Sequence, residues 1–478
     1  MDNASAVITR TAGTSRRANR SERSYTLRYH TTAGGGRIDM PENMVDWLYG
    51  LQHFGIKLGL DNIQALLDVL DRPERNYRTV HIAGTNGKGS VAAMLDAMLA
   101  AAGKRSGLFT SPHLVRPNER IRLLGTDIDD RELNRRLAAM RDIIEAARVD
   151  GTLAAHPSFF EVITATALEA FRQHKMDVAV LEVGLGGRLD ATNAVAADVG
   201  VVVSIGLDHV KTLGPTIEKI AAEKAGIVKP GMRVISGVVQ AEARRVLRDA
   251  CERAGAECID ARERFALELG DAKEFTLRGK HGTYSDLRVA LLGPHQIDNA
   301  RVAVAAFELV MECFGEAAHE DTVREGLARV RWAGRLQWID RGAGQPRMLL
   351  DGAHNPAGIR CIAEHLNDQP LGDDAVLLFG ATSGKPLDEL LKPLAAHCRT
   401  VVVGRPPVEC GLDPQEVAAA AKPFFERVEA APDTAEALSL ATAIAGDGGT
   451  IFVTGSLYLV GEVLGLLEHR QVPGPVAM

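Results

Sequence analysis

A glycine-rich stretch with one lysine carries the clearest chemistry in the chain: Gly84-Thr-Asn-Gly-Lys-Gly-Ser90. Glycines let backbone N–H groups point at an anion, a helix N-terminus adds its positive end, and a lysine supplies a mobile cation. The spacing departs from the strict phosphate-loop pattern, because Gly84 lies only three residues before Gly87 and Gly89 separates the lysine from the serine. The stretch predicts polyphosphate binding, with an ordinary glycine turn as the alternative.

Polar side chains that could hold a metal follow three other apolar runs. Ser111 follows residues 104–110, Glu182 ends the run 177–182, and His209 comes after the run 199–205. Mg²⁺ takes oxygen ligands and commonly pairs one or two carboxylates with substrate phosphates, which suits Glu182 best. Taken singly, these residues also fit a surface loop, a strand-end acid and a packed or exposed imidazole. Together they predict a magnesium site beside the phosphate loop.

Two further segments carry polar groups near apolar sequence. The glycines, charges and amides of residues 184–193 cannot form core, so they predict a flexible binding turn. Lys224 is flanked by apolar residues in a helical pattern over 217–225, where a solvated lysine is the ordinary interpretation.

These residues must be positioned by alternating strands and helices, which predict a mostly parallel sheet with helices on both faces. The strands expected in the first series are 77–82, 104–110, 176–183, 199–205, 233–237 and 287–292. The helices expected with them begin at Ser90 or cover 130–147, 160–173, 217–225, 241–254 and 296–314. A second series follows residue 332, with strands at 348–350, 375–379, 400–403 and 450–453. Open parallel sheets bind ligands at the carboxyl ends of their strands, where the polar clusters fall.

The predicted fold class is therefore α/β. A P-loop parallel-sheet ATPase domain over residues 40–333 precedes a smaller Rossmann-like α/β domain over residues 334–478. Residues 1–39 form a polar leader, with seven arginines against two acids in residues 1–38, and we expect it to be disordered. An organellar transit peptide is the alternative for this leader.

Composition narrows the class of protein. The net charge of −7 gives no electrostatic case for nucleic acid, and no uncharged apolar stretch is long enough to span a bilayer. Six cysteines are scattered without close metal-type pairs, as in a reduced cytosolic protein. We expect a soluble, cytoplasmic monomer that binds neither nucleic acid nor membrane.

The motifs in their order resemble the folylpolyglutamate synthase and dihydrofolate synthase family of the Mur-ligase superfamily. The resemblance covers residues 44–466 and rests on the phosphate loop, Ser111-Pro-His-Leu114, residues 182–193, Asp208-His209, Glu223-Lys-Ala-Gly-Ile227, His295-Gln-Ile-Asp-Asn299, Trp332-Ala-Gly-Arg335, Asp351-Gly-Ala-His-Asn-Pro356 and Gly455-Ser-Leu-Tyr-Leu459. One departure is visible at residues 380–386, where Lys385 lacks the acidic neighbours that family members often carry.

The resemblance implies a role for each matching position. The residues that it implies for ATP are Gly87, Lys88, Gly89, Ser90, Asn299, Arg335 and Asp351. It implies Ser111, Glu182 and His209 as ligands of magnesium, with two ions expected, and Lys224 as a lysine carboxylated by CO₂. Lys88, Lys224 and His354 are the residues to which it gives catalytic roles. The pteroate pocket that it implies is lined by Phe159, Phe160, Arg188, Leu189, Asp190 and Ala191.

The activity implied is ATP-dependent addition of L-glutamate to dihydropteroate, to the glutamate tail of a reduced folate, or to both, through an acyl phosphate. We expect bifunctionality, with the Asp190 carboxylate pairing with the amino-pyrimidine edge of the pterin. Three alternatives stay open: a Mur-type ligase acting on a cell-wall nucleotide precursor, a nonenzymatic nucleotide switch, and an ATPase that does not ligate. Only about 40 plausible structured residues precede Gly84, which disfavours the first, because Mur ligases usually place a uridine-nucleotide domain there.

Overall fold

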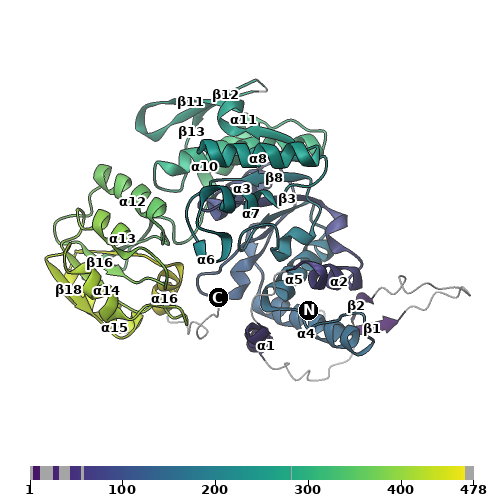
Figure 1. Cartoon of the computed structure of the whole chain (residues 1–478), viewed down its shortest axis with the longest axis horizontal. Coiled ribbons are helices and arrows are strands. Elements are labelled where there is room, and N and C mark those ends of the chain that lie inside the picture. The colour runs from purple at the N-terminus through teal and green to yellow at the C-terminus, as the bar shows by residue number, and fades with distance from the viewer. Residues whose placement is uncertain (1–3, 11–24, 32–42, 55–58, 281, 469–478) are drawn as a thin grey trace, which may run out of the picture.

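The computed structural model describes residues 4–10, 25–31, 43–54, 59–280 and 282–468. Two α/β units lie side by side, and the second, green to yellow, is at the left of Figure 1. The larger unit is built on an eight-stranded sheet and the smaller on a six-stranded sheet. No helix in these ranges is long and apolar enough to cross a membrane.

The eight-stranded sheet has the order β10-β9-β8-β3-β7-β4-β5-β6 and is parallel from β10 to β4. Its strands are β3 (Arg78–Ala83), β4 (Ser106–Phe109), β5 (Ile121–Leu123), β6 (Thr126–Asp127), β7 (Val178–Glu182), β8 (Val199–Val202), β9 (Arg233–Ser236) and β10 (Glu257–Asp260). Because β3 lies between β7 and β8, the turns that follow these three strands meet at one edge of the sheet.

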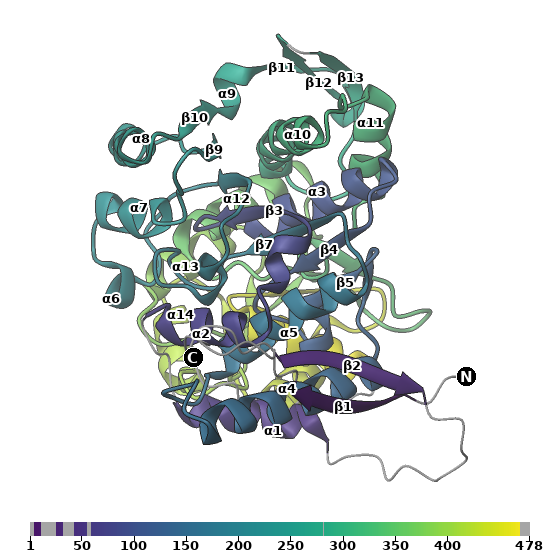
Figure 2. The same ribbon diagram turned by 90° about the vertical axis from the view of Figure 1, so that its right-hand side faces the viewer.

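Helices cover both faces of this sheet, as Figure 2 shows. One face carries α3 (Lys88–Ala101), α10 (His295–Cys313) and α11 (Glu320–Arg329). The other carries α1 (Met44–Gly50), α2 (Asp61–Val69), α4 (Asp130–Val149) and α5 (Phe159–Gln173). Strand β7 is buried throughout, because Val178 and Val180 pack on the first face while Ala179 and Leu181 pack on the second. This double burial explains why its sequence is continuously apolar before Glu182.

The six-stranded sheet has the order β14-β15-β19-β16-β17-β18 and is parallel except at β14. Its strands are β14 (Gln337–Ile339), β15 (Arg347–Leu350), β16 (Val376–Phe379), β17 (Thr400–Val403), β18 (Arg427–Ala430) and β19 (Thr450–Thr454). The helices around it are α12 (Pro356–Asp368), α13 (Leu387–Leu394), α14 (Pro414–Ala421), α15 (Thr434–Ala445) and α16 (Leu457–Leu467). Separate buried clusters form on its two faces, so this unit has a core of its own.

The edge of the larger unit departs from the prediction. A three-stranded antiparallel sheet, β11 (Phe265–Leu269), β12 (Phe275–Gly279) and β13 (Thr283–Leu287), stands where one strand was expected. The strand predicted at 287–292 is wrong, since β13 ends at Leu287 and the next residues join no sheet. Their apolar character serves packing instead: Leu291 is buried, and the Ala290 N–H donates to the carbonyl of Leu327 in α11.

The remaining helices of the larger unit are α6 (Val210–Leu213), α7 (Ile217–Ala225), α8 (Ala241–Ala254) and α9 (Ala261–Arg264). In the leader, β1 (Ala4–Arg10) pairs antiparallel with β2 (Tyr25–Thr31), which departs from the disorder expected there. Both segments are rich in residues that favour strands, such as valine, isoleucine, threonine and tyrosine. The rest of the predicted leader lies outside the described residues.

Candidate functional site

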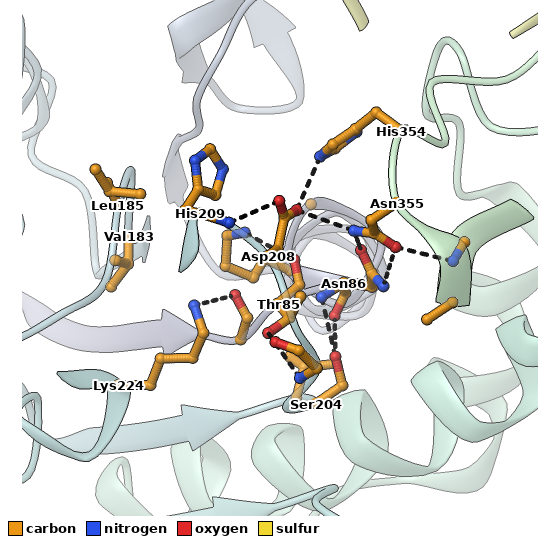
Figure 3. Close-up of a pocket in the computed structure, with 18 of the residues that line it drawn as sticks. Thr85, Asn86, Val183, Leu185, Ser204, Asp208, His209, Lys224, His354 and Asn355 are labelled. Carbon is orange, nitrogen blue, oxygen red and sulfur yellow. Dashed lines mark hydrogen bonds and ion pairs between the residues drawn. The ribbon is translucent and has the colours of Figure 1, made fainter. Parts of the chain in front are cut away.

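A cavity of about 1700 Å³ lies where the carboxyl ends of the first sheet face the turns of the second unit. Figure 3 shows side chains of both units pointing into it. All the residues predicted to have a role in the site line this cavity: Gly87, Lys88, Gly89, Ser90, Ser111, Phe159, Phe160, Glu182, Arg188, Leu189, Asp190, Ala191, His209, Lys224, Asn299, Arg335, Asp351 and His354. The fold therefore gathers residues up to 267 positions apart, from Gly87 to His354, into one site.

The phosphate loop joins β3 to α3. Gly87 caps α3 with φ of 82°, a left-handed conformation that favours glycine, and a Cβ there would lie 2.5 Å from Asn299 Oδ1. The glycine thus lets α10 approach the helix N-terminus, and Gln296 Nε2 donates to Ser90 Oγ at 3.4 Å. Lys88 Nζ donates to the Thr85 carbonyl at 3.4 Å, so the lysine folds back over its own loop. This arrangement suits a polyphosphate at the positive end of α3.

Glu182 and Ser111 meet beside Lys88. The Glu182 carboxylate lies 4.0 Å from Lys88 Nζ and accepts from the Ser111 N–H at 3.3 Å. Burial raises the pKa of Glu182, and the charge of Lys88 opposes that rise. Among the residues that the structure describes, the buried Ser111 Oγ has no hydrogen-bond partner, and a cation would satisfy this oxygen. A carboxylate and a free hydroxyl oxygen at this point fit a hard cation such as Mg²⁺.

His209 follows β8 and lines the cavity. Its backbone has a left-handed conformation, with φ of 48°. Desolvation lowers its pKa to about 4, and Lys385, His354 and Lys88 contribute to that shift against the pull of Asp208. The ring is therefore neutral at pH 7, as metal ligation requires. Ligand atoms of Asp208, His209 and His354 lie within 4.8 Å of one another, so this end of the cavity gathers a second set of metal-type groups.

Lys224 is buried on α7, and its Nζ donates to the Gly84 carbonyl at 2.9 Å. Burial, together with the nearby charge of Lys88, lowers the pKa of Lys224 to about 7. A lysine with this pKa is partly neutral at physiological pH, and the neutral amine is the form that reacts with CO₂.

The turn after β7 is held by Asp190. One carboxylate oxygen accepts from the Gly184 and Leu185 N–H groups at 3.0 and 2.9 Å, and the other accepts from the Thr192 N–H and hydroxyl at 3.1 and 2.5 Å. Both oxygens are thus engaged within the turn. The interpretation of Asp190 as the direct partner of a pterin edge is not supported by this geometry, because the turn itself consumes the carboxylate.

Aromatic side chains line the cavity near that turn. Phe159 stacks on Tyr49 with ring centroids 5.7 Å apart, and Phe160 packs against Phe109 at 5.8 Å. Both phenylalanines begin α5, whose N-terminus is fixed by a capping box between Ser158 and Glu161. This wall suits a flat, largely apolar group.

In the second unit, Asp351 follows β15 and organises the chain around Arg335. Its carboxylate accepts from the Leu336 and Ala353 N–H groups at 2.9 and 2.8 Å. Burial raises the pKa of Asp351, and the charge of Arg335 opposes that rise. Arg335 Nη1 donates to the Gly334 carbonyl at 3.0 Å and the side chain points into the cavity.

The two units are joined at Asp208, whose role the sequence did not reveal. Its carboxylate contacts Lys385 Nζ at 2.5 Å, His354 Nε2 at 3.2 Å and Asn355 Nδ2 at 3.0 Å, and all three come from the second unit. Figure 3 shows His354 and Asn355 converging on it. We name these four residues the Asp208 cluster. Burial alone would raise the pKa of Asp208, but the His354 hydrogen bond and the charge of Lys385 hold it well below its usual range.

A pair of amides reinforces the junction. Asn355 Nδ2 donates to Asn86 Oδ1 at 2.9 Å and Asn86 Nδ2 donates to Asn355 Oδ1 at 3.1 Å. Asn86 lies in the phosphate loop, so the second unit touches that loop directly. The sequence held one signal for Asp208 and Asn355, which is that each adjoins a predicted site residue. Asp208 directly precedes His209, and Asn355 directly follows His354 in the turn after β15.

Two family models match the chain: the Mur ligase middle domain over residues 82–307 and the Mur ligase glutamate ligase domain over residues 334–457. A dihydrofolate synthase/folylpolyglutamate synthase of Bacillus subtilis is 34% identical over 435 residues, covering 87% of this chain and 96% of that protein. Its counterpart from Mycobacterium tuberculosis is 37% identical over 412 residues, covering 81% and 83%.

Solved structures share this fold. The M. tuberculosis folylpolyglutamate synthase complexed with ADP and AMPPCP has a TM-score of 0.80 at 34% identity, covering 89% of this chain and 98% of that one. An Escherichia coli protein in complex with DHPP and ADP has a TM-score of 0.77 at 28% identity, covering 90% and 99%. A bifunctional folylpolyglutamate synthase/dihydrofolate synthase with Mn, AMPPNP and L-glutamate bound has the same TM-score and identity, covering 90% and 99%.

Proposed function

The chain belongs to the folylpolyglutamate synthase and dihydrofolate synthase family of Mur ligases, and from this premise we propose that it is an ATP-dependent ligase that adds L-glutamate to a folate-type acceptor. The acceptors are dihydropteroate and the glutamate tail of a reduced folate. Relatives named for both activities, and a related structure with a nucleotide and L-glutamate bound, support this proposal.

The observation that carries the proposal is the convergence of three kinds of group in one cavity. A phosphate loop, an aromatic wall at Phe159 and Phe160, and cations of the second unit all line it. A nucleotide switch or a simple ATPase has no use for the second and third of these. The family match favours folate-type acceptors over the cell-wall nucleotide precursors of the Mur-type alternative.

The chemistry follows from the acceptor. A carboxylate does not condense with an amine in water, so transfer of the γ-phosphoryl group of ATP first converts it to an acyl phosphate. Lys88 and the N–H groups at the start of α3 neutralise charge on the phosphoryl group. The amine of glutamate then attacks the acyl carbon and phosphate leaves. Arg335 and the three partners of Asp208 come from the second unit, across the cavity, so closure completes the site and keeps water from the acyl phosphate.

A divalent cation fits the chain's own residues. Ser111, with its orphan hydroxyl oxygen, and Glu182 would hold one ion beside the phosphates, and neutral His209 would be a further ligand. Two ions are consistent with the second group at Asp208, His209 and His354. Bound Mg²⁺ supplies charge neutralisation for phosphoryl transfer.

Carboxylation of Lys224 belongs to the same proposal. The buried amine has a pKa of about 7, so a neutral fraction is available to react with CO₂. The product is an anionic carbamate. It would remove the repulsion between the positive charges of Lys224 and Lys88, and it would leave a negative charge facing the cation site.

The remaining expectations are also proposals. The six cysteines are all free, which agrees with a reducing, cytoplasmic location. The monomeric state, and the absence of nucleic acid or membrane partners, stay predictions that gel filtration and binding assays can test.

The test is a steady-state assay of purified protein with ATP, Mg²⁺ and L-glutamate, comparing dihydropteroate with a reduced folate. We expect product with both acceptors, and phosphate release that requires acceptor and glutamate together. Product from neither acceptor would refute the proposed function. Product from the reduced folate alone would refute bifunctionality.

A further inference from the structure

Arg120 is a buried cation that the proposed mechanism leaves unused. It ends the segment that joins Ser111 to β5, it is 5% exposed, and it lines the cavity. No ion pair joins its guanidinium to a carboxylate within the ranges that the structure describes. Burial lowers the pKa of Arg120, yet a guanidinium stays charged at any physiological pH. A buried charge without a counter-ion destabilises a fold, so such a residue is retained where a ligand supplies the partner.

The immediate neighbours of Arg120 are uncharged. Its Nε donates to His113 Nδ1 at 2.8 Å, and a nitrogen that accepts this bond carries no proton, so the imidazole is neutral. The other ring nitrogen lies 3.1 Å from the Tyr49 hydroxyl. The guanidinium also lies 5.1 Å from the centre of the Phe159 ring. These contacts fix the direction of the side chain without neutralising it.

The acid closest in sequence is committed elsewhere. The Glu119 carboxylate accepts from the N–H groups of Leu114, Val115 and Arg116 at 2.6 to 2.8 Å, so it closes the loop before Arg120. Glu182 contacts Lys88 and the Ser111 N–H instead. Both carboxylates act on Arg120 through their charges, but neither forms an ion pair with its guanidinium in the part of the chain that the structure describes.

The position of Arg120 separates it from the phosphate-binding groups. Lys88 lies against Glu182, whereas Arg120 lies against the aromatic wall at Phe159. The second unit closes this side as well: Tyr458 of α16 lines the cavity, and Gly461 of the same helix packs directly on the Leu114 carbonyl. An anion here would sit between the aromatic wall and the nucleotide site.

We propose that Arg120 binds the acceptor carboxylate that is to be phosphorylated, and thereby selects acceptors that carry one. The inference rests on the proposed function, since it names the group that holds the acceptor of that reaction. A planar guanidinium can pair with a carboxylate through two parallel N–H bonds, which fixes the carboxylate plane toward the γ-phosphate.

A binding cycle tests this proposal. Dihydropteroate has a single carboxylate, so its carboxamide analogue removes the charge and little else. Dissociation constants for acid and amide are measured by calorimetry, with AMPPNP and Mg²⁺ present, for wild type, Arg120→Gln and Arg116→Gln. Arg116 is the matched control, since it lies in the same segment but pairs with Asp130 outside the cavity. We expect wild type and control to prefer the acid by about tenfold or more, and Arg120→Gln to show a ratio near one.

Other outcomes contradict the inference. An unchanged acid-to-amide ratio in Arg120→Gln overturns it even if wild-type ligation is normal, whereas a wild type that neither binds nor ligates the acceptor refutes the proposed function. If Arg120→Gln binds AMPPNP more weakly but keeps the acid-to-amide ratio of wild type, the anion that Arg120 binds is a phosphate of the nucleotide, and the proposal is overturned. If Arg120→Gln fails to fold, Arg120→Lys is measured instead. Lysine keeps the positive charge but lacks the planar pair of N–H donors, so we expect an acid-to-amide ratio between those of wild type and one. A ratio equal to that of wild type would overturn the assignment.

Discussion

Replacing Lys385 by alanine should slow ligation by opening the two units. Lys385 Nζ lies 2.5 Å from Asp208 Oδ1, and the two side chains are only 13% and 6% exposed. A hydrogen bond between charged groups in such a setting contributes about 1.5–3 kcal/mol. If the closed arrangement loses about 2 kcal/mol of stability, the ratio of closed to open molecules falls about 30-fold, since every 1.4 kcal/mol changes an equilibrium constant tenfold. His354 and Asn355 still contact Asp208 in the variant, so this figure is an upper bound.

The assay is steady-state phosphate release with dihydropteroate, L-glutamate and ATP, alongside small-angle scattering of the nucleotide-bound protein. We expect a lower rate and a larger radius of gyration for Lys385→Ala. Lys392→Ala is the matched control, because Lys392 is exposed on α13 and lies outside the cavity. A wild-type rate in Lys385→Ala, or an equal loss in both variants, would refute the assignment of closure to the Asp208 cluster.

The remaining predictions use the same assays. Lys88→Ala should abolish ligation while thermal unfolding stays unchanged, because the lysine contacts the loop and supports no core; near-normal turnover would remove the phosphate-loop assignment. Lys224→Ala should be nearly inactive and Lys224→Glu partly active if a carbamate is required, and a fully active alanine variant would contradict that requirement. Asp190→Ala should lower stability by about 2–4 kcal/mol and depress both activities together, since four hydrogen bonds of the turn are lost; selective loss of dihydrofolate formation would restore the direct pterin contact. Because the pKa of Asp208 is depressed, its carboxylate stabilises the closed arrangement at every pH above the ordinary aspartate pKa, and this stabilisation is lost only well below that pKa. Small-angle scattering between pH 5 and 8 should therefore show no opening of the two units. Opening within that range would contradict the role of Asp208 in closure.

The two parallel sheets could be predicted because their strands are short apolar runs between periodic helices. Helix α8 and strand β17 fall at the predicted bounds, since strong amphipathic or apolar patterns mark them. The sheet of β11 to β13 could not be predicted as easily. Its strands are half-exposed and carry charged residues such as Glu268 and Arg278. Their sequences therefore show neither an apolar run nor a strict alternation that would predict a strand.

The site shows the same division. Phosphate-loop glycines and strand-end acids are recognisable because their chemistry depends on local sequence. The partners of Asp208 are not, because Lys385 lies 177 residues away and only the packing of the two units brings it there. Asp190 shows the reverse case: the sequence identifies the residue, but its four hydrogen bonds are a property of the folded turn and could not be predicted from it.

In the proposed mechanism the acceptor carboxylate is activated as an acyl phosphate before glutamate attacks. Dihydropteroate labelled with ¹⁸O in its carboxylate tests this order of steps, with the released phosphate analysed by mass spectrometry. Phosphoryl transfer to the carboxylate predicts one ¹⁸O atom in each phosphate, formed only when glutamate is also present. Amide product accompanied by unlabelled phosphate would contradict the mechanism.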